Sequence, residues 1–375
     1  ACGTPSQPDQ PDGTETWREA YEETGAYLQA QTAPTAGSIG GEWAVIGLSR
    51  AGLLSDETAQ SYEQTVEDYV KQAGSVRLHH AKSTENSRTI LGLTAAGYNA
   101  ANVAGVDLTA GLTDMAYLRA QGTNGPIWAL IALDCHGYDI PQCADGEEQT
   151  TREGLVAEIL SYQCSDGGWA LMGDESDVDM TAMAIQALAA YYKSNSSAKK
   201  AVDKGLSWLS SVQQNDGGFT SWGAANSESC AQVIVALTAL GIDPTKDSRF
   251  IKNGVSVLDA LCSFAVNGGG FKHLATETSA NGMATEQGFY ALVAYYRLLN
   301  GQTSLYDMTD VKLEGVKAEE PVDDTDKSDD TADTEVEDTS SGGQVVLWVV
   351  IGVVAVGGIA ALAVTSKKRH GRDAE

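Results

Sequence analysis

The chain has few of the residues that build metal sites and aromatic cavities. Its 375 residues include five His and five Phe, and its Cys form no Cys-x-x-Cys pair. Because the five His also lack the spacing of zinc ligands, we expect no metal site and no cofactor. The shortage of Phe argues against a large cavity whose aromatic rings stabilise positive charge.

Basic residues are scarce as well. The chain carries 24 Lys and Arg against 51 Asp and Glu, a formal net charge of −27. Such an acidic surface repels phosphate groups, which argues against nucleic acid or an anionic membrane surface as a partner. The simplest explanation of the charge is a solvated surface that keeps the protein soluble.

The C-terminal end of the chain is not globular in composition. Residues 314–344 hold 12 acids against Lys317 and Lys327, which predicts a disordered acidic stalk. Residues 345–364 contain no charged side chain, and this length predicts one transmembrane helix. The basic residues 365–375 then predict a cytoplasmic tail.

We therefore expect a single-pass protein of the cell membrane, held there by its C-terminal helix, with its N-terminal part outside the cell. This topology requires a signal peptide, which we expect to have been removed, and residues 1–14 are expected to be flexible. Outside the cell the six Cys can pair, and Cys135 and Cys143 are close enough in sequence to clip one loop.

Three similar turns recur in the middle of the chain. Asp166–Trp169, Asp216–Phe219 and Gly268–Phe271 each place adjacent Gly residues before an aromatic residue, at steps of 50 and 52 residues. A run rich in small and apolar residues follows each turn. Six such runs occur along the chain, at Gly47, Gly92, Ala132, Ala187, Ala236 and Ala291. A repeat of this length predicts an array of similar helical units.

Each run is apolar around its circumference, as expected of a helix enclosed on all sides. The stretches before the runs predict amphipathic outer helices at residues 17–31, 58–73, 108–121, 151–163, 198–213 and 249–264. Six inner and six outer helices predict an all-α fold, an α6/α6 toroid of six helical hairpins over residues 15–313. The Gly residues permit the tight turns, and the aromatic residues are expected to fill the seams between units.

The turns also carry a resemblance to a known family. Residues 163–169 read Gln-x-x-Asp-Gly-Gly-Trp, and residues 213–219 read Gln-x-x-Asp-Gly-Gly-Phe. Over about residues 15–300 the chain resembles the terpenoid cyclase and protein prenyltransferase superfamily of alpha-alpha toroids, and Gly282–Val311 is similar to the last unit of its bacterial cell-surface members. The resemblance implies a ligand site in the central cavity. A more distant resemblance is to the helical domain of intrinsic factor and transcobalamin, which captures cobalamin together with a β-rich domain that has no counterpart here.

One segment resembles a catalytic motif of this superfamily. Residues 177–182 read Asp-Val-Asp-Met-Thr-Ala, similar to the Asp-x-Asp-Asp-Thr-Ala motif of triterpene cyclases, whose central Asp protonates an alkene or epoxide. The resemblance makes Asp179 the candidate general acid and Asp177 its carboxylate partner. Met180 stands where the motif has its third Asp, so one group that tunes the acid is missing.

Other chemistries of related toroids fit the sequence less well. A squalene-type cyclase needs a second helical barrel, for which this chain has no room. A protein prenyltransferase needs Asp, Cys and His zinc ligands, but Cys230 lies one unit too late and His273 lies in a loop. The internal thioester of complement-type domains needs a Cys that is missing before Glu286 and Gln287.

Polar residues gather at the starts of the predicted inner helices. In a toroid these starts open on one mouth, so their side chains would meet aromatic residues of the turns at the rim of one cavity. Many of the polar residues would instead serve as helix caps. The candidate ligand-binding residues are Trp169, Phe219, Trp222, Glu228, Phe271, His273, Glu286 and Gln287.

Three functions remain open from the sequence. The first is a recognition module without catalysis, which binds a small molecule, a glycan or a surface protein at its cavity or mouth. The second is an enzyme, terpene cyclase-like or lyase-like, that uses Asp179 as its acid. The third is a structural spacer, which would require a ring filled by side chains.

Overall fold

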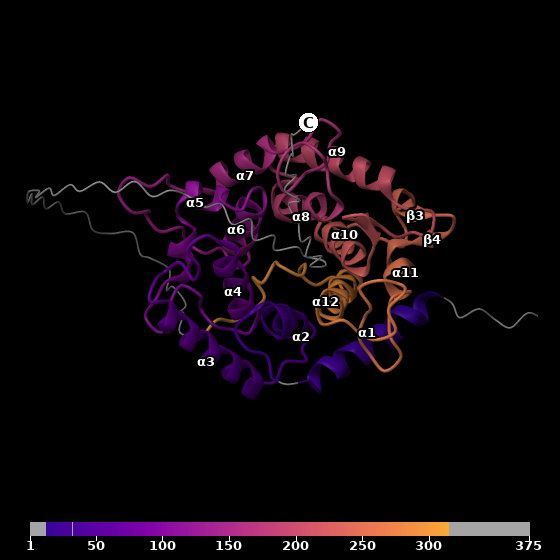
Figure 1. The fold of residues 1–375 in the computed structure, drawn as a ribbon, viewed down its shortest axis with the longest axis horizontal. Helices are drawn as coiled ribbons and strands as arrows, with labels where there is room; N and C mark the ends of the chain where they lie inside the picture. The colour runs from indigo at the N-terminus through magenta and orange to yellow at the C-terminus, as the bar shows by residue number, and fades with distance from the viewer. Residues whose placement is uncertain (1–12, 32, 315–375) are drawn as a thin grey trace, which may run out of the picture.

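Six helices form a closed inner ring (Figure 1). The computed structural model describes residues 13–31 and 33–314. The inner helices are α2 (Trp43–Arg50), α4 (Thr84–Ala95), α6 (Asn124–Asp134), α8 (Val178–Leu188), α10 (Ser227–Ala239) and α12 (Gly282–Leu299). Each packs against the next, and α12 packs against α2 to close the ring. All six predicted runs begin on these helices or at their ends, so the toroid is confirmed.

A second layer of helices surrounds the ring (Figure 1). It consists of α1 (Gly13–Gln29), α3 (Asp56–Ala73), α5 (Met115–Arg119), α7 (Arg152–Ser161), α9 (Ser196–Val212) and α11 (Val257–Cys262). In α9, Val202, Leu206 and Leu209 are buried while Lys200 and Lys204 are exposed. In α6, by contrast, every residue from Asn124 to Leu133 is buried. The two hydrophobic patterns of the sequence therefore sort the helices into layers.

The third outer unit differs from the single helix predicted over residues 108–121. The chain forms the 3-10 helix η2 (Leu108–Leu112) and then the short helix α5. Asp107 and Asp114 precede these two elements, and each accepts a hydrogen bond from an amide two residues further on, at 2.9 and 3.1 Å. Because a residue that caps a helix has extended backbone geometry, the second cap divides the segment.

The sixth outer unit also differs from its prediction over residues 249–264. The 3-10 helix η4 (Ser248–Phe250) is followed by an antiparallel hairpin of β3 (Ile251–Lys252) and β4 (Val255–Ser256), and only then by α11. The hairpin turn is Asn253-Gly254, with positive φ angles of 50° and 81°. Asn-Gly is the preferred sequence for such a two-residue turn, so this hairpin was readable from the sequence.

The Gly-Gly-aromatic turns have the structural role predicted for them. Gly167 and Gly217 have positive φ angles of 102° and 80°. Beside the equivalent Gly269, a Cβ atom would lie 2.5 Å from the carbonyl oxygen of Glu23 in α1, so no other residue fits there. The aromatic residues that end the turns are fully buried, and they fill the seams between the layers: Trp169, Phe219 and Phe271.

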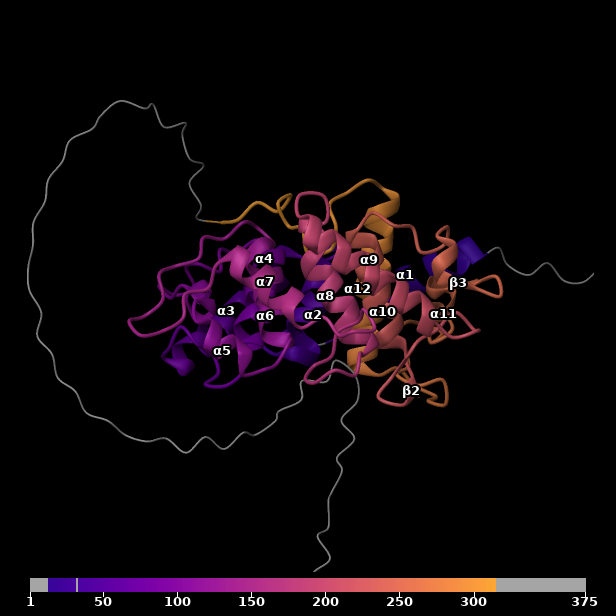
Figure 2. The same ribbon diagram turned by 90° about the horizontal axis from the view of Figure 1, so that it is seen from above.

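The inner helices run in the same direction, so the ring has two different faces. We call the N-terminal face the side where these helices begin, and the C-terminal face the side where they end. Hydrogen bonds join the starts of neighbouring inner helices on the first face. The Gly40 amide before α2 donates to Glu286 at the start of α12, and the Thr123 hydroxyl before α6 donates to the Ala170 carbonyl before α8. Figure 2 shows the ring edge-on, with β2 (Ala224–Ala225) at one face and the orange-yellow end of the described chain at the other.

Residues 301–314, which we call the strap, cross the C-terminal face. Arg50 of α2 and Arg297 of α12 both bind the carboxylate of Asp310 in the strap, each at 2.7 Å. Further along, the Met308 amide donates to the Cys135 carbonyl, and the Glu314 amide donates to the Gly97 carbonyl, both at 2.8 Å. The strap therefore links the ends of α2, α12, α6 and α4.

Aromatic side chains fill part of the ring's centre. The ring of Trp43 in α2 lies 5.4 Å from that of Trp128 in α6 and 6.1 Å from that of Tyr290 in α12, measured between centroids. Trp128 in turn contacts Tyr306 of the strap edge-on at 5.8 Å. These contacts join α2, α6, α12 and the strap across part of the ring's centre. An open tunnel through this part of the ring is therefore excluded.

Several sequence predictions lie outside the described residues. These are the flexible segment 1–14 for the most part, nearly all of the stalk 314–344, the transmembrane helix 345–364 and the tail 365–375. Within residues 13–31 and 33–314, none of the helices has the length and apolar character that a bilayer crossing demands.

Candidate functional site

The start of α8 brings two carboxyl groups together on the N-terminal face. Asp177 caps the helix: its Oδ1 accepts hydrogen bonds from the amides of Asp179 (3.0 Å) and Met180 (3.1 Å). Its Oδ2 accepts a hydrogen bond from the hydroxyl of Ser221 in β1 (Thr220–Ser221). Both oxygens of Asp177 are therefore bound by donors.

Asp179 has a different environment. It is only 5% exposed, and its Oδ1 has no hydrogen-bond partner among the described residues. Burial raises the pKa of Asp179 well above its ordinary value, and the charge of Asp177 raises it further, while the hydroxyls of Ser229 and Ser221 oppose the shift. The two adjacent carboxyl groups thus differ in environment, since Asp177 is bound by donors and Asp179 is buried.

A second carboxyl group lies at the start of α10. Glu228 is 1% exposed, and its Oε2 lies 2.8 Å from Nδ1 of His273. The Ser227 hydroxyl also approaches this oxygen, at 3.2 Å. Because the charge of Glu228 contributes to the raised pKa of Asp179, the two acids belong to one cluster. The structure thus brings together four of the predicted site residues: Asp177, Asp179, Glu228 and His273.

Glu286 forms a separate site at the start of α12. Its Oε1 accepts a hydrogen bond from the Gly40 amide at 2.6 Å, and its Oε2 is buried without a partner among the described residues. Burial raises the pKa of Glu286 to about 8, the Gly40 bond opposes this, and the charge of Glu42 adds to it. The adjacent Gln287 accepts a hydrogen bond from Gln232 Nε2 at 3.0 Å.

Sequence reasoning missed the carboxyl group at the start of α2. Glu42 is fully buried and forms an ion pair with Arg88 of α4, at 3.0 Å, while the Tyr62 hydroxyl donates to it at 3.1 Å. Arg88 also binds Glu85 at 2.7 Å. The signal was an acid directly after Gly40 and Gly41, a fourth set of adjacent Gly before an inner helix. The charged and hydrogen-bonding groups of these side chains are paired with one another, so a structural role is enough to explain the cluster.

Three predicted ligand-binding residues occupy other positions than expected. Trp169, Phe219 and Phe271 are fully buried in the seams, where they offer no surface to a ligand at the N-terminal face. The indole of Trp169 donates to the Ile159 carbonyl at 2.8 Å, and its amide is bound by the Thr181 hydroxyl at the same distance. The prediction that these three contact a ligand is corrected: they hold outer and inner helices together.

Trp222 has the opposite character. It lies at the tip of the β1–β2 hairpin and is 70% exposed. Its φ angle is +51°, and Gly223 follows at +81°. The β3–β4 hairpin has nearly the same angles but uses Asn253, a residue that adopts this left-handed conformation more readily. A large aromatic residue in strained backbone geometry at the surface is not explained by the turn, and it indicates a function.

Other exposed apolar residues lie on the same face. Ile39, Val76 and Met172 are 60%, 38% and 59% exposed, and they precede α2, α4 and α8. With Trp222 before α10, four large apolar side chains therefore stand beside the starts of inner helices. An exposed apolar set around buried polar groups is typical of a binding surface.

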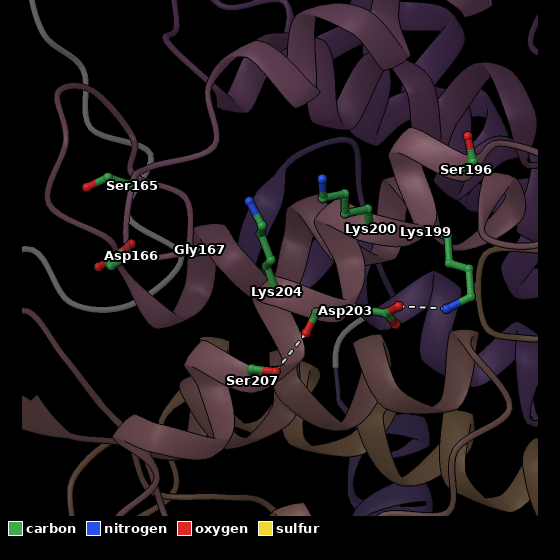
Figure 3. A pocket seen from close by; sticks show the side chains of 9 residues that line it. All are labelled: Ser165, Asp166, Gly167, Ser196, Lys199, Lys200, Asp203, Lys204 and Ser207. Carbon is green, nitrogen blue, oxygen red and sulfur yellow. Dashed lines mark hydrogen bonds and ion pairs between the residues drawn. The ribbon is translucent and has the colours of Figure 1, made fainter.

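A groove of about 550 Å³ lies on the outer layer instead. Ser165–Gly167 border it on one side, and α9 borders it with Lys199, Lys200 and Lys204. Figure 3 shows Lys199 turned to Asp203, while Lys200 and Lys204 extend to a common side. These lysines lie on the water side of an amphipathic helix, and that position explains them.

Metal and disulfide chemistry find no support in the described part of the chain. Residues 13–31 and 33–314 contain no group of three or more His, Cys, Asp or Glu that could hold a metal ion. The five Cys of this part are free thiols, so the expected pairing of Cys135 with Cys143 is not formed. Cys135 is buried at the end of α6, whereas the Cys143 thiol interacts with the Glu147 carbonyl in its own loop.

Comparisons with known proteins agree with this architecture. The family model described as the prenyltransferase alpha-alpha toroid domain matches residues 108–309, more than half of the chain. Among solved structures, a polysaccharide lyase is similar, with a TM-score of 0.51 and 12% sequence identity over 77% of this chain and 98% of the lyase chain. At this identity the likeness shows the fold alone. No curated protein matches the sequence.

Proposed function

Because the chain belongs to the prenyltransferase alpha-alpha toroid family, whose fold serves more than one chemistry, we propose a function from its own residues: the N-terminal face binds a neutral glycan. The observation that carries this proposal is Trp222. Its ring is 70% exposed in strained backbone geometry, and it follows Ser221, which binds the Asp177 carboxylate.

Sugar rings match this surface in two ways. Their C–H faces stack on an exposed aromatic ring, and an indole offers a large and rigid one. Their hydroxyl groups donate and accept hydrogen bonds, as do the carboxyl groups of Asp179 and Glu286, each of which has one oxygen without a partner among the described residues. A buried polar atom without a partner is costly, so a ligand hydroxyl or a water there would stabilise the face.

The charge of this face favours a neutral saccharide over an acidic one. Asp177, Glu228, Glu42 and Glu286 all lie at the starts of inner helices, and Arg88 is already held by Glu42 and Glu85. Acidic groups outnumber the nearby Lys82 and Lys272, which favours a neutral saccharide over a uronic acid. The similar structure of a polysaccharide lyase supports only the choice of saccharides as the class to test.

The proposal includes attachment to the cell surface. Residues 345–364 would anchor the chain in the membrane, and residues 314–344 would hold the toroid away from it. The support is the sequence pattern: an uncharged stretch with a basic flank after an acidic, polar one. Protease treatment of intact cells tests this topology, because an exported toroid is cleaved without lysis and a cytoplasmic one is protected.

Calorimetric titration of the full chain tests glycan binding. The ligands are neutral hexose and N-acetylhexosamine oligosaccharides, with uronic acid oligosaccharides for comparison. We expect saturable binding of a neutral ligand and at least a tenfold loss of affinity in Trp222→Ala. Leu299→Ala, an exposed apolar change on α12 away from this face, is the matched control and should leave the affinity unchanged. Binding of no neutral ligand, or equal affinity of Trp222→Ala, would overturn the proposal and favour a structural spacer.

A second candidate is acid catalysis by Asp179 on the bound glycan. The specific observation in its favour is that Asp179 is buried beside the charge of Asp177, and both raise the pKa of Asp179. Asp179→Asn would then abolish turnover of a glycan that still binds, while the exposed Asp174→Asn would not. Turnover that survives Asp179→Asn would exclude this role. Isoprenoid cyclisation is less well supported, because Trp43, Trp128 and Tyr290 fill part of the ring's centre.

A further inference from the structure

A second concave site lies on the C-terminal face, away from the proposed glycan surface. It is a cavity of about 440 Å³ between the ends of α6, α8 and α10 on one side and strap residues Ser304–Asp307 and Thr309 on the other. Its size is in the range of cavities that hold small organic molecules. None of the candidate site residues from the sequence lines it.

The cavity walls are small side chains with two aromatic rings. Ala187, Ala189, Ala190 and Ala239 form much of the helical wall, and Tyr191 and Tyr306 contribute the rings. Small residues at consecutive helix ends leave the space open, where Leu or Met would close it. Apolar walls of this kind suit the hydrocarbon part of a ligand.

Two buried polar atoms of the lining lack a partner among the described residues, Gln186 Oε1 and the Tyr306 hydroxyl, and the first is an acceptor. Gln186 is 7% exposed, and its Nε2 donates to the main-chain carbonyl and the side-chain Oε1 of Gln232, both at 3.0 Å. Its own Oε1 is buried without a hydrogen bond among the described residues. Gln232 fixes the orientation of this amide, because its Nε2 donates in turn to Gln287 Oε1 and the Tyr290 hydroxyl. The cavity therefore presents a fixed acceptor that needs a donor.

The charged side chains that line the cavity are acidic. Its lining contains Asp134 and Asp307 but no Lys, Arg or His. Asp134 is bound by Arg152 and the Tyr191 hydroxyl, the Asp307 carboxylate accepts from Thr309, and Arg50 binds the Asp307 main-chain carbonyl. The ends of α6, α8 and α10 add the negative ends of three helix dipoles. The acidic lining and the helix ends thus favour a positively charged ligand inside the cavity.

We propose that this cavity binds a small organic cation, an alkylammonium or arylalkylammonium. Its N–H group donates to Gln186 Oε1, its charge lies against the rings of Tyr191 and Tyr306, and its hydrocarbon part packs on the Ala walls. The negative ends of the helices stabilise the charge. This site is independent of the proposed glycan function, because the two lie on opposite faces.

Titration of the full chain with three probes of similar shape tests the proposal. They are 2-phenylethylammonium, 2-phenylethanol and 3-phenylpropanoate, which differ in charge. We expect the ammonium to bind at least tenfold more tightly than the alcohol, and the carboxylate not to bind. Equal affinity for the ammonium and the alcohol, or binding of none of the three, would refute the site.

Two variants locate the binding. Ala239→Leu fills the cavity without touching the Gln network and should lower the ammonium affinity at least tenfold, whereas Ala224→Leu on the opposite face should not change it. Gln186→Leu removes the acceptor and should reduce the preference for the ammonium over the alcohol. Unchanged affinity in Ala239→Leu would place any binding elsewhere and overturn the proposal, even if Gln186→Leu does not fold.

Discussion

The two faces of the ring are built from opposite ends of the same six helices, and their charges differ accordingly. Acids occupy the N-terminal face, where Glu42, Asp177, Glu228 and Glu286 stand at helix starts. On the C-terminal face, the inner helices instead end with basic residues in α2 and α12, Arg50 and Arg297. Amide groups that attract anions are exposed at a helix start, and carbonyl groups that attract cations are exposed at its end.

This difference shows which features need a function to explain them. Helix dipoles and caps account for the sorting of acids and bases between the faces. They do not account for carboxyl oxygens that lack partners, for the exposed ring of Trp222, or for an open cavity beside Gln186. The functional proposals therefore depend on these three features and not on the charge of either face.

The largest expected effect concerns the N-terminal face and depends on pH. Because the pKa of Glu286 is raised from 4.5 to about 8, the folded protein binds more protons than the unfolded chain between these values. The free energy of unfolding should therefore fall as pH rises from about 4.5 to 8, by roughly 5 kcal/mol at most for this group. Glu286→Gln should remove this part of the slope, measured by urea unfolding at several pH values.

The control for this prediction is the exposed Glu153→Gln, which should keep the wild-type slope. A remaining slope in Glu286→Gln is expected from Asp179, whose pKa is raised in the same direction by burial and by Asp177. The double variant with Asp179→Asn should be flatter still. An unchanged slope in Glu286→Gln would show that Glu286 is ionised in the folded protein at these pH values.

The next effect concerns the C-terminal face. Arg297→Met removes the donor that binds Asp310 at 2.7 Å, the Thr303 carbonyl at 2.7 Å and the Arg50 carbonyl at 3.0 Å. Because Arg297 is buried and Asp310 only partly so, we expect a loss of about 2–4 kcal/mol in unfolding free energy. Faster amide exchange over the strap should accompany it.

Arg249→Met provides the comparison, because Arg249 pairs with Asp247 near the surface and should contribute about 1 kcal/mol or less. Similar losses in both variants would mean that the strap is not held by its buried arginines. The expected difference between the buried Arg297 and the more exposed Arg249 would then be absent.

The smallest effect compares the two hairpins. Trp222→Asn gives the β1–β2 turn the residue that the β3–β4 turn already has at the same backbone angle. We expect about 1 kcal/mol of added stability, because Asn tolerates the left-handed conformation better, together with the loss of glycan binding. A matching change, Asn253→Trp, should destabilise without creating binding. Lower stability of Trp222→Asn would mean that the indole stabilises the fold.

Much of the fold was predictable because it depends on local patterns. The Gly-Gly-aromatic turns and the apolar runs identify all six inner helices, since a helix enclosed on all sides leaves a recognisable sequence. The third and sixth outer units were predicted wrongly for a local reason as well. Asp114 is a helix cap and Asn253-Gly254 is a turn, and both lie within otherwise amphipathic stretches. The prediction of a single helix followed the hydrophobic periodicity and missed these two local signals.

The candidate site was predictable only in part. The spacing of Asp177 and Asp179 placed both at the start of α8, and the structure adds the reason for their difference, since one is bound by donors and the other is buried. The contact of Gly40 with Glu286 was not predictable, because it joins residues 246 positions apart where the ring closes. Nor could the sequence distinguish the aromatic residues that fill seams from Trp222, which is exposed on a hairpin tip.

The strap has a consequence for how the protein would be presented to its surroundings. The described chain ends at Glu314, which pairs with Gly97 just beyond the end of α4. The described chain therefore leaves the toroid at its C-terminal face. With the proposed anchor in a membrane, the C-terminal face is the one connected to it. Trp222 lies on the opposite, N-terminal face, so a large polymer bound there would not compete with a small molecule in the cavity beside Gln186.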